Sequence, residues 1–261
     1  MKDKYKNKEI VGIIPARMQS SRFYGKPLAK ILGKEMIQWV YEICAGCRIL
    51  KEVYVATDHE DIANFCQAKG MRFMMTSPEH LTCSDRSSEV CSQVGADFIV
   101  EVQGDEPTLL SSEIDNLIEC AFSFDQFDVV IPYTEITAEE ALDPNNVKVV
   151  IGPHQQALFF SRSPIPYDFK NKLPQYYKQV GLYIWSSASI RRFSQIPRGY
   201  LEKIEDSHML RLIEHGFDAR MVHSSIKTVG VDVPQQIAQA EEFLRKRQEQ
   251  TAFDLNEQEK A

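Results

Sequence analysis

The chain has 261 residues, of which 43% are hydrophobic and 26% are charged, an ordinary balance for a folded globular protein. Its 30 Lys and Arg residues against 37 Asp and Glu residues give a net charge of −7, which argues against a general nucleic-acid-binding surface. No apolar run reaches the roughly 18 residues that a membrane-spanning helix needs. The first ten residues are mostly polar, unlike an export signal, so we expect a cytoplasmic protein without membrane or nucleic-acid partners.

The six cysteines lie at positions 44, 47, 66, 83, 91 and 120, without the spacing of a disulfide framework. Cys44 and Cys47 form one CxxC pair, but neither a second pair nor a nearby His completes a set of zinc ligands. We therefore expect reduced thiols that pack inside the protein, and no domain stabilised by disulfides or by zinc at this pair.

Short apolar runs alternate with amphipathic stretches over the first two-thirds of the chain. The runs typical of buried strands are 9–14, 53–56, 72–75, 97–102 and 128–131. Apolar residues three or four positions apart predict helices around 36–44, 62–66, 90–94 and 114–121. Repeated strand–helix–strand units of this length predict an α/β fold with a mostly parallel, Rossmann-like sheet flanked by helices.

The pattern changes after about residue 145, where β-rich segments follow one another closely. These segments are 147–151, 157–160 and 180–185. They predict a small antiparallel extension over about 147–185, a common place for a dimer contact or a lid over a binding site.

The last third of the chain returns to mixed structure. A helix over 201–215, a strand over 219–222 and a final helix from 234 to about 247 are predicted from the apolar spacing. We therefore expect a single domain over 1–250, followed by a loose polar tail over 251–261.

A basic loop follows the first predicted strand. Arg17, Arg22 and Lys26 lie within ten positions, together with the small residues Ser20 and Gly25. Fixed positive charge and accessible backbone N–H groups suit phosphate oxygens, although a solvated basic loop is the alternative. The segment contains neither GxxxxGK[ST] nor GxGxxG, which disfavours a P-loop protein and a nicotinamide-dependent oxidoreductase.

Two aspartates stand at the ends of later strands, in VQGDEP (102–107) and VGVDVP (229–234). Asp105 and Asp232 could share one Mg²⁺, because this ion prefers carboxylate oxygens and substrate phosphates. The alternatives are a turn with an N-capping acid for Asp105 and the N-cap of the last helix for Asp232, just before Pro234.

A fourth polar segment, HLTCSDR (80–86), joins a strand to a helix. Ser84 or Asp85 could cap that helix, and Arg86 could reach a phosphate or a base, with a surface charge as the alternative. We expect a structural role for His80, since no neighbouring acid or nucleophile in the sequence completes a catalytic relay.

Six blocks, in this order, resemble those of the 3-deoxy-manno-octulosonate (Kdo) cytidylyltransferases, also called CMP-Kdo synthetases. They are IPARMQSSRFYGKPL (14–28), ATDHEDIA (56–63), VQGDEP (102–107), PNNVKVV (144–150), FFSRSPIP (159–166) and GVDVP (230–234). The resemblance runs from about residue 13 to 244 and implies a nucleotidyltransferase sheet with a small antiparallel extension. It also implies a homodimer whose contact lies in the extension over about 147–185.

The resemblance implies that the anomeric hydroxyl of an acidic sugar attacks the α-phosphate of CTP, giving a CMP-sugar and pyrophosphate for lipopolysaccharide biosynthesis. It implies Mg²⁺ held by Asp105 and Asp232. The implied catalytic residues are Arg17, Lys26 and Asp105, and the implied nucleotide-binding residues are Pro15, Ala16, Arg17, Ser20, Arg22, Lys26, Arg86 and Gln103. Such a transfer needs positioning and charge stabilisation, which agrees with the absence of a Ser–His–acid pattern.

The departures from the family concern the sugar side, where the implied sugar-binding residues are Gln179, Tyr183, His208 and Arg162. Gln179 stands where the family commonly has His, and His208 where it often has Glu. Cys83 and Ser84 stand where it usually has Gly and Thr. The acceptor expected from the resemblance is therefore Kdo or a variant such as 8-amino-Kdo. The alternatives are another acidic sugar or a phosphonate as acceptor and, more remotely, a non-catalytic nucleotide-binding protein.

Overall fold

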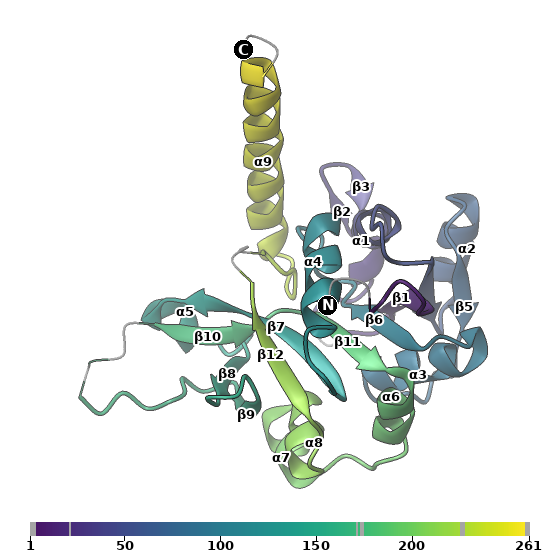
Figure 1. Ribbon diagram of the computed structural model, residues 1–261. Helices are drawn as coiled ribbons and strands as arrows, with labels where there is room; N and C mark the ends of the chain where they lie inside the picture. Colours follow the sequence, from purple (N-terminus) through teal and green to yellow (C-terminus); the bar gives the residue numbers. More distant parts are fainter. Residues whose placement is uncertain (1–3, 21, 171, 173–174, 225–227, 259–261) are drawn as a thin grey trace.

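The computed structural model describes residues 4–20, 22–170, 172, 175–224 and 228–258, with side chains up to residue 250 (Figure 1). Ten strands of the described chain form one mixed sheet, in the order β5-β4-β1-β6-β11-β7-β10-β8-β9, with β12 also paired to β7. In that order the strands are Phe73–Met75, Glu52–Thr57, Ile10–Ala16, Phe98–Val102, Leu182–Ser186, Val129–Ile136, Tyr176–Gln179, Lys148–Ile151, Ala157–Ser161 and, for β12, Ala219–His223.

The parallel half of the sheet, β5-β4-β1-β6, has the predicted α/β organisation. All of β1 is buried, because Ile10 and Ile14 pack into one apolar cluster while Val11 and Ile13 pack into another on the opposite face. The helices that accompany this half are α1 (Met36–Ala45), α2 (Glu60–Ala68), α3 (Cys83–Val94) and α4 (Ser111–Ala121). The four helices expected from the apolar spacing in the first half of the chain are therefore confirmed, with α3 starting earlier than expected.

The strand β11 is not part of an extension, contrary to expectation. It lies between β6 and β7 in the middle of the sheet and runs antiparallel to β6, with Ile184 opposite Val100. Its side chains alternate between the two apolar clusters, and Trp185 is fully buried. The sequence pattern misplaced this strand because a continuous apolar run does not reveal the direction or the neighbours of a strand.

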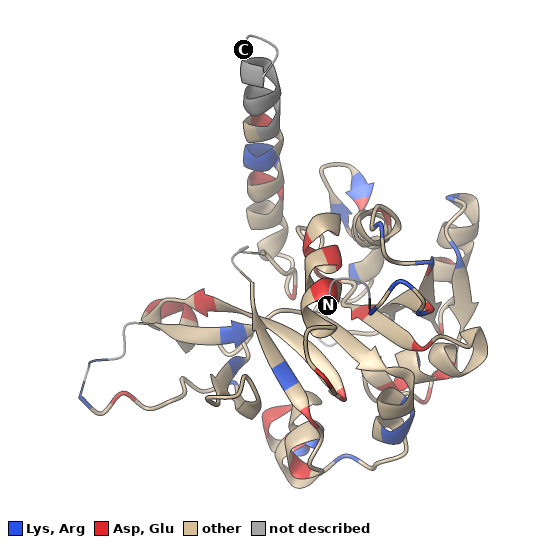
Figure 2. Ribbon diagram, in the orientation of Figure 1, with Lys and Arg blue, Asp and Glu red and all other residues tan. Residues whose placement is uncertain are grey.

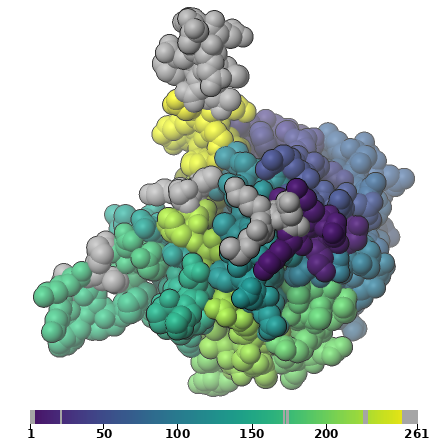
Figure 3. Space-filling view, viewed as in Figure 1, coloured from purple at the N-terminus to yellow at the C-terminus, as the bar shows by residue number. Residues whose placement is uncertain are grey.

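The antiparallel arm is formed by the end of β7 with β10, β8 and β9. In the ribbon and the space-filling view, β10 and the end of β7 extend to one side of the molecule (Figures 1 and 3), whereas Val149 of β8 and Phe160 of β9 are buried in the same apolar cluster as Trp185. Tyr167 and Phe169, in the connection between β9 and β10, are largely exposed. The dimer contact expected in this part of the chain stays a prediction.

The helix expected over 201–215 is two helices, α7 (Tyr200–Glu205) and α8 (Met209–Glu214). Asp206 separates them in the left-handed conformation, with φ of 45°, which ends the first helix. Two shorter helices were not expected from the sequence, α5 (Ala138–Leu142) and α6 (Ser187–Ser194).

The last helix, α9 (Gln236–Gln258), continues beyond its expected end near residue 247 and projects from the body (Figure 1). The backbone of 251–258 is helical, and 259–261 lie outside the described residues, so the loose polar tail over 251–261 stays a prediction. Ion pairs one turn apart, Arg245 with Glu241 and Lys246 with Glu242, support the helical conformation before this segment.

The charged residues of both signs are mixed along the chain, and four of the six cysteines are buried, whereas Cys120 is exposed. Lys and Arg are interspersed with Asp and Glu over the ribbon (Figure 2). All six cysteines are free, and Cys44 and Cys47 pack into an apolar cluster. Within the described part of the chain, no helix has both the length and the apolar character needed to cross a membrane.

Candidate active site

A cavity of about 590 Å³ opens at the carboxyl ends of β1 and β6, where ligands bind in open α/β sheets. Every site residue expected from the sequence lines this one cavity. These residues are Pro15, Ala16, Arg17, Ser20, Arg22, Lys26, Arg86, Gln103, Asp105, Arg162, Gln179, Tyr183, His208 and Asp232. The topology thus gathers segments that are more than 200 positions apart in the sequence, from Pro15 to Asp232.

Lys26 lies between the two aspartates. Its Nζ is 2.5 Å from Asp105 Oδ2 and 3.6 Å from Asp232 Oδ1. The backbone holds the two acidic loops together, because the N–H of Val231 donates to the carbonyl of Asp105 at 2.9 Å. Burial by itself would lower the pKa of Lys26, but the two carboxylates raise it overall, so the ammonium stays charged.

Asp232 does not serve as the N-cap that the sequence allowed as an alternative. Its carboxylate accepts a hydrogen bond of 3.0 Å from Arg22 Nη2 and faces Lys26. The N–H groups of Asp232 and Val233 instead donate to Gln236 Oε1, at 2.6 and 3.1 Å. Gln236 therefore satisfies the backbone N–H groups just before α9, which leaves the Asp232 carboxylate for the cavity.

The carboxylates of Asp105 and Asp232 fit a divalent cation. They already flank one cation, the Lys26 ammonium, and both line the cavity. Oxygen donors from separate loops, beside space for a phosphate, match the preference of Mg²⁺ for one or two carboxylates together with substrate oxygens. These two residues would hold the ion.

The basic loop after β1 offers two further guanidinium groups. Arg17 is exposed and has no hydrogen bond or ion pair with another described residue, whereas Arg22 contacts Asp232 and Asn145. Lys26 opens a short 3-10 helix, η1 (Lys26–Leu28), after Gly25, whose φ of 73° suits glycine. This arrangement places three positive charges on one side of the cavity, as a phosphate chain requires.

Arg86 is buried and bound by two polar side chains, and it is not the surface charge that the sequence allowed as an alternative. It is 3% exposed, its Nη2 donates to Asp58 Oδ2 at 2.7 Å, and its Nη1 donates to Thr76 Oγ1. Asp58 and Thr76 follow the ends of β4 and β5. The side chain of Gln103 is fixed in a similar way, because its Nε2 donates to Glu101 Oε1 at 2.7 Å.

The start of α3 differs from both capping alternatives. Thr82 is the N-cap: its Oγ1 accepts from the N–H of Asp85 at 3.2 Å, and Asp85 Oδ2 accepts from the N–H of Thr82 at 3.1 Å. Ser84 is buried and donates to Glu101. His80 pairs with Glu89, 2.5 Å from Nε2 to Oε2, an acid that the sequence did not place beside it.

On the opposite side of the cavity, the expected sugar-binding residues differ in whether their polar atoms already have partners within the protein. Gln179 Oε1 is buried without a hydrogen-bond partner among the described residues, and the ring of Tyr183 packs edge-on against that of His208 at 5.8 Å. Arg162 donates from Nε, Nη1 and Nη2 to three backbone carbonyls, those of Glu205, Pro144 and Asp206. Its guanidinium therefore fixes the chain around the break between α7 and α8.

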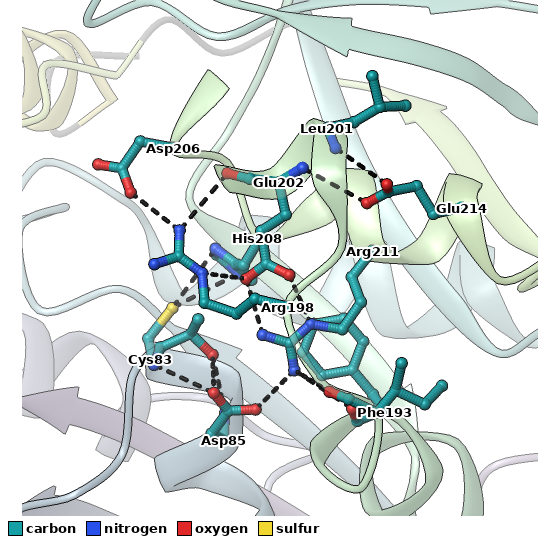
Figure 4. Close-up of polar contacts among 12 residues, drawn as sticks. Cys83, Asp85, Phe193, Arg198, Leu201, Glu202, Asp206, His208, Arg211 and Glu214 are labelled. Carbon is teal, nitrogen blue, oxygen red and sulfur yellow. Dashed lines mark hydrogen bonds and ion pairs between the residues drawn. The ribbon is translucent and has the colours of Figure 1, made fainter. Parts of the chain in front are cut away.

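Several residues of the cavity wall were not found from the sequence. Arg198 lines the cavity and contacts Glu202, which is paired with Arg211 behind it (Figure 4). Only the spacing of four between Arg198 and Glu202 could have indicated a pair. Glu106 also lines the cavity, and burial, followed by the nearby Asp105, raises its pKa to about 7.

The comparisons with known proteins agree with this geometry. A family model described as cytidylyltransferase matches residues 11–260. A 3-deoxy-manno-octulosonate cytidylyltransferase of Bacteroides thetaiotaomicron is 38% identical over 251 residues, covering 92% of this chain and 99% of the relative. The chain belongs to this family of cytidylyltransferases.

Further relatives support the same family. An Escherichia coli 3-deoxy-manno-octulosonate cytidylyltransferase is 38% identical over 222 residues, covering 85% of this chain and 90% of the relative. The solved structure of a CMP:2-keto-3-deoxy-manno-octonic acid synthetase complexed with CTP superposes with a TM-score of 0.85 at 36% identity, covering 92% of this chain and 99% of that chain. The resemblance found in the sequence and the expected α/β fold are thus confirmed.

Proposed function

We propose that this chain transfers CMP from CTP to the anomeric hydroxyl of Kdo or a close variant, releasing pyrophosphate. The observation that carries the proposal is the placement of Lys26 between Asp105 and Asp232 in a cavity lined by further cations. The similar synthetase solved with CTP and the curated relatives support the nucleotide and the acceptor class. The product serves lipopolysaccharide biosynthesis.

In the proposed reaction, Arg17, Arg22 and Lys26 bind the triphosphate and offset its charge. When bound by Asp105 and Asp232, Mg²⁺ would supply positive charge to the phosphoryl oxygens. Arg86 and Gln103 stand on the nucleotide side, each already held by a hydrogen bond that fixes its orientation. The groups are in place before the substrate arrives, which is how electrostatic stabilisation becomes effective.

The acceptor lies, in this proposal, between the phosphate-binding loop and the wall that contains Gln179, Tyr183 and His208. Burial lowers the pKa of His208 to about 4, so its imidazole is neutral near pH 7 and offers a hydrogen bond rather than a positive charge. A neutral His208 and the carbonyl oxygen of Gln179, which both line the cavity, suit hydroxyl or amino groups of a sugar.

The test is pyrophosphate release with each of the four NTPs and Mg²⁺. The acceptors are Kdo, 8-amino-Kdo, N-acetylneuraminate and a 2-keto phosphonate. We expect release with CTP and a Kdo-type sugar, and loss of at least about 100-fold in turnover for Asp105→Asn. Lys30→Met, an exposed change near the same loop, is the control and should keep full turnover.

Two results would oppose the proposal. Equal release with all four NTPs would contradict a cytidylyltransferase, and CTP binding without release for every acceptor would favour a non-catalytic nucleotide-binding protein. Preference for N-acetylneuraminate or the phosphonate would support the transfer of CMP but would show that the acceptor is not a Kdo-type sugar.

A further inference from the structure

Three potential metal ligands from separate elements meet at the sugar side of the cavity. Cys83 is the first residue of α3, Glu101 lies in β6, and His208 immediately precedes α8. The distance from Cys83 Sγ to His208 Nε2 is 3.5 Å, and one ligand atom of each residue lies within 4.8 Å of the other two. Figure 4 shows the sulfur of Cys83 directed toward the imidazole of His208.

Glu101 has the features of an oriented but incomplete ligand. It is fully buried, and its Oε1 accepts hydrogen bonds from Ser84 Oγ at 3.1 Å and Gln103 Nε2 at 2.7 Å. Its Oε2 is buried and makes no hydrogen bond of normal geometry among the described residues, although the side chains of Cys83 and Ser87 lie close enough to lower the pKa of Glu101. A buried carboxylate oxygen without a partner is costly, which points to a group that satisfies it.

We propose that Cys83, Glu101 and His208 bind one zinc ion. Thiolate, imidazole and carboxylate are the ligands that zinc takes in proteins, and a sulfur–nitrogen separation of 3.5 Å suits two ligands at 2.0–2.3 Å from one ion, at roughly tetrahedral angles. The charges also balance, since one thiolate, one carboxylate and a neutral imidazole together cancel the charge of Zn²⁺. This site is separate from the all-oxygen pair of Asp105 and Asp232.

The site has an open side toward the cavity. Cys83 and His208 line the cavity, whereas Glu101 is fully buried behind them. A fourth coordination position facing the cavity would take water or an anionic oxygen of the acceptor, as in zinc sites with three protein ligands. That last step rests on the proposed function, while the binding of zinc does not.

The protonation states of the metal-free cluster agree with this assignment. Burial raises the pKa of the Cys83 thiol well above its ordinary value and that of Glu101 to about 7, so neither group is fully ionised without a nearby cation. The imidazole of His208 is neutral, which is the form that binds metal. Zinc binding would displace the thiol proton of Cys83, together with the proton of any protonated Glu101, to solvent.

Two of the three residues are far apart in the sequence. Cys83 and His208 are 125 positions apart, and the fold brings their side chains into contact.

The experiment uses the untagged full chain and needs no turnover. We expect about one zinc per chain by elemental analysis after expression with zinc. We also expect a thiolate-to-cobalt charge-transfer band when Co²⁺ is added to metal-free protein. Cys83→Ser should abolish the band, and Ser84→Ala, which removes a donor to Glu101, should weaken cobalt binding by about 10–100-fold. Cys91→Ser, a buried cysteine on the same helix, is the matched control and should change neither result.

Absence of both zinc and the cobalt band in the wild-type chain would overturn the proposal, and so would a band that persists in Cys83→Ser. Circular dichroism of each variant separates loss of the site from loss of the fold. If zinc binds but no acceptor reacts with CTP, the metal site stands and the proposed function fails.

Discussion

Arg211 holds the carboxylate of Glu202 with two hydrogen bonds, Nε to Oε2 and Nη2 to Oε1, each 2.7 Å long. Both residues are almost completely buried, and Arg211 Nη1 also donates to Asp85 Oδ1 at 2.9 Å (Figure 4). The pair joins α7, α8 and the start of α3. It therefore supports the wall of the cavity that carries Cys83 and His208.

Removing one charge of this pair should destabilise the fold. We expect Glu202→Gln to lower the free energy of unfolding by about 3–5 kcal/mol, because the Arg211 guanidinium would stay buried with an incomplete partner. Urea unfolding at pH 7 measures this change in the free energy of unfolding. Lys203→Gln, exposed on the same helix, should change stability by less than about 0.5 kcal/mol. A cost for Glu202→Gln as small as that of the control would contradict a stabilising role for the pair.

The sequence predicted those elements whose residues interact locally. The buried run that becomes β1 and the spacing of α1 follow from apolar periodicity alone. The direction of β11 and the break at Asp206 did not follow, because the first depends on which strands flank it and the second on a single left-handed residue.

The same distinction between local and long-range contacts applies to the residues of the candidate site. Arg17 and Lys26 share one loop, so the sequence could mark them as an anion-binding group. The contact of Cys83 with His208, like the burial of Glu101, exists only once three elements have packed together. Arg162 carried the right chemistry for a sugar carboxylate, and three of its five N–H donors already bind backbone carbonyls, so its role in sugar binding stays a prediction.

Lys26→Met should separate metal binding from turnover. The variant leaves Asp105 and Asp232 without their shared ammonium, so we expect tighter Mg²⁺ binding to the nucleotide-free chain and a larger rise of Tm with Mg²⁺ than in wild type. We also expect kcat/KM for CTP to fall at least about 100-fold, because the variant lacks the ammonium charge that stabilises the phosphates. Thermal unfolding with and without Mg²⁺ and pyrophosphate release measure the two effects.

Lys30→Met is the control for both measurements, since Lys30 is exposed and pairs with Glu35 instead. If Mg²⁺ raises Tm in Lys26→Met no more than in wild type, the two aspartates are not the magnesium ligands.

Arg162→Lys tests whether this residue holds the backbone or binds the sugar. A lysine cannot serve three carbonyls in a plane, so we expect a loss of about 2 kcal/mol or more in the free energy of unfolding. Urea unfolding measures this loss, and the KM for the acceptor is measured beside it. Unchanged stability with a raised KM would show that the guanidinium acts on the sugar directly.

Glu113 should make stability depend on pH. It is 8% exposed and its Oε2 accepts from the N–H of Leu110 at 2.9 Å, at the start of α4. Burial raises its pKa above the ordinary 4.5, although the Leu110 N–H and Arg247 act in the opposite direction. Between 4.5 and the raised value the folded chain binds more protons than the unfolded chain, so this group lowers stability as pH rises through that window.

Glu113→Gln removes this ionisation and keeps an oxygen for the Leu110 N–H. We therefore expect the stability of the variant relative to wild type to increase from pH 4 to pH 8, as measured by urea unfolding at both values. Glu119→Gln, on the exposed side of the same helix, should give the same difference from wild type at both pH values. An equal difference at pH 4 and pH 8 for Glu113→Gln would mean that Glu113 ionises alike in the folded and unfolded chains, and its burial would then carry no electrostatic cost.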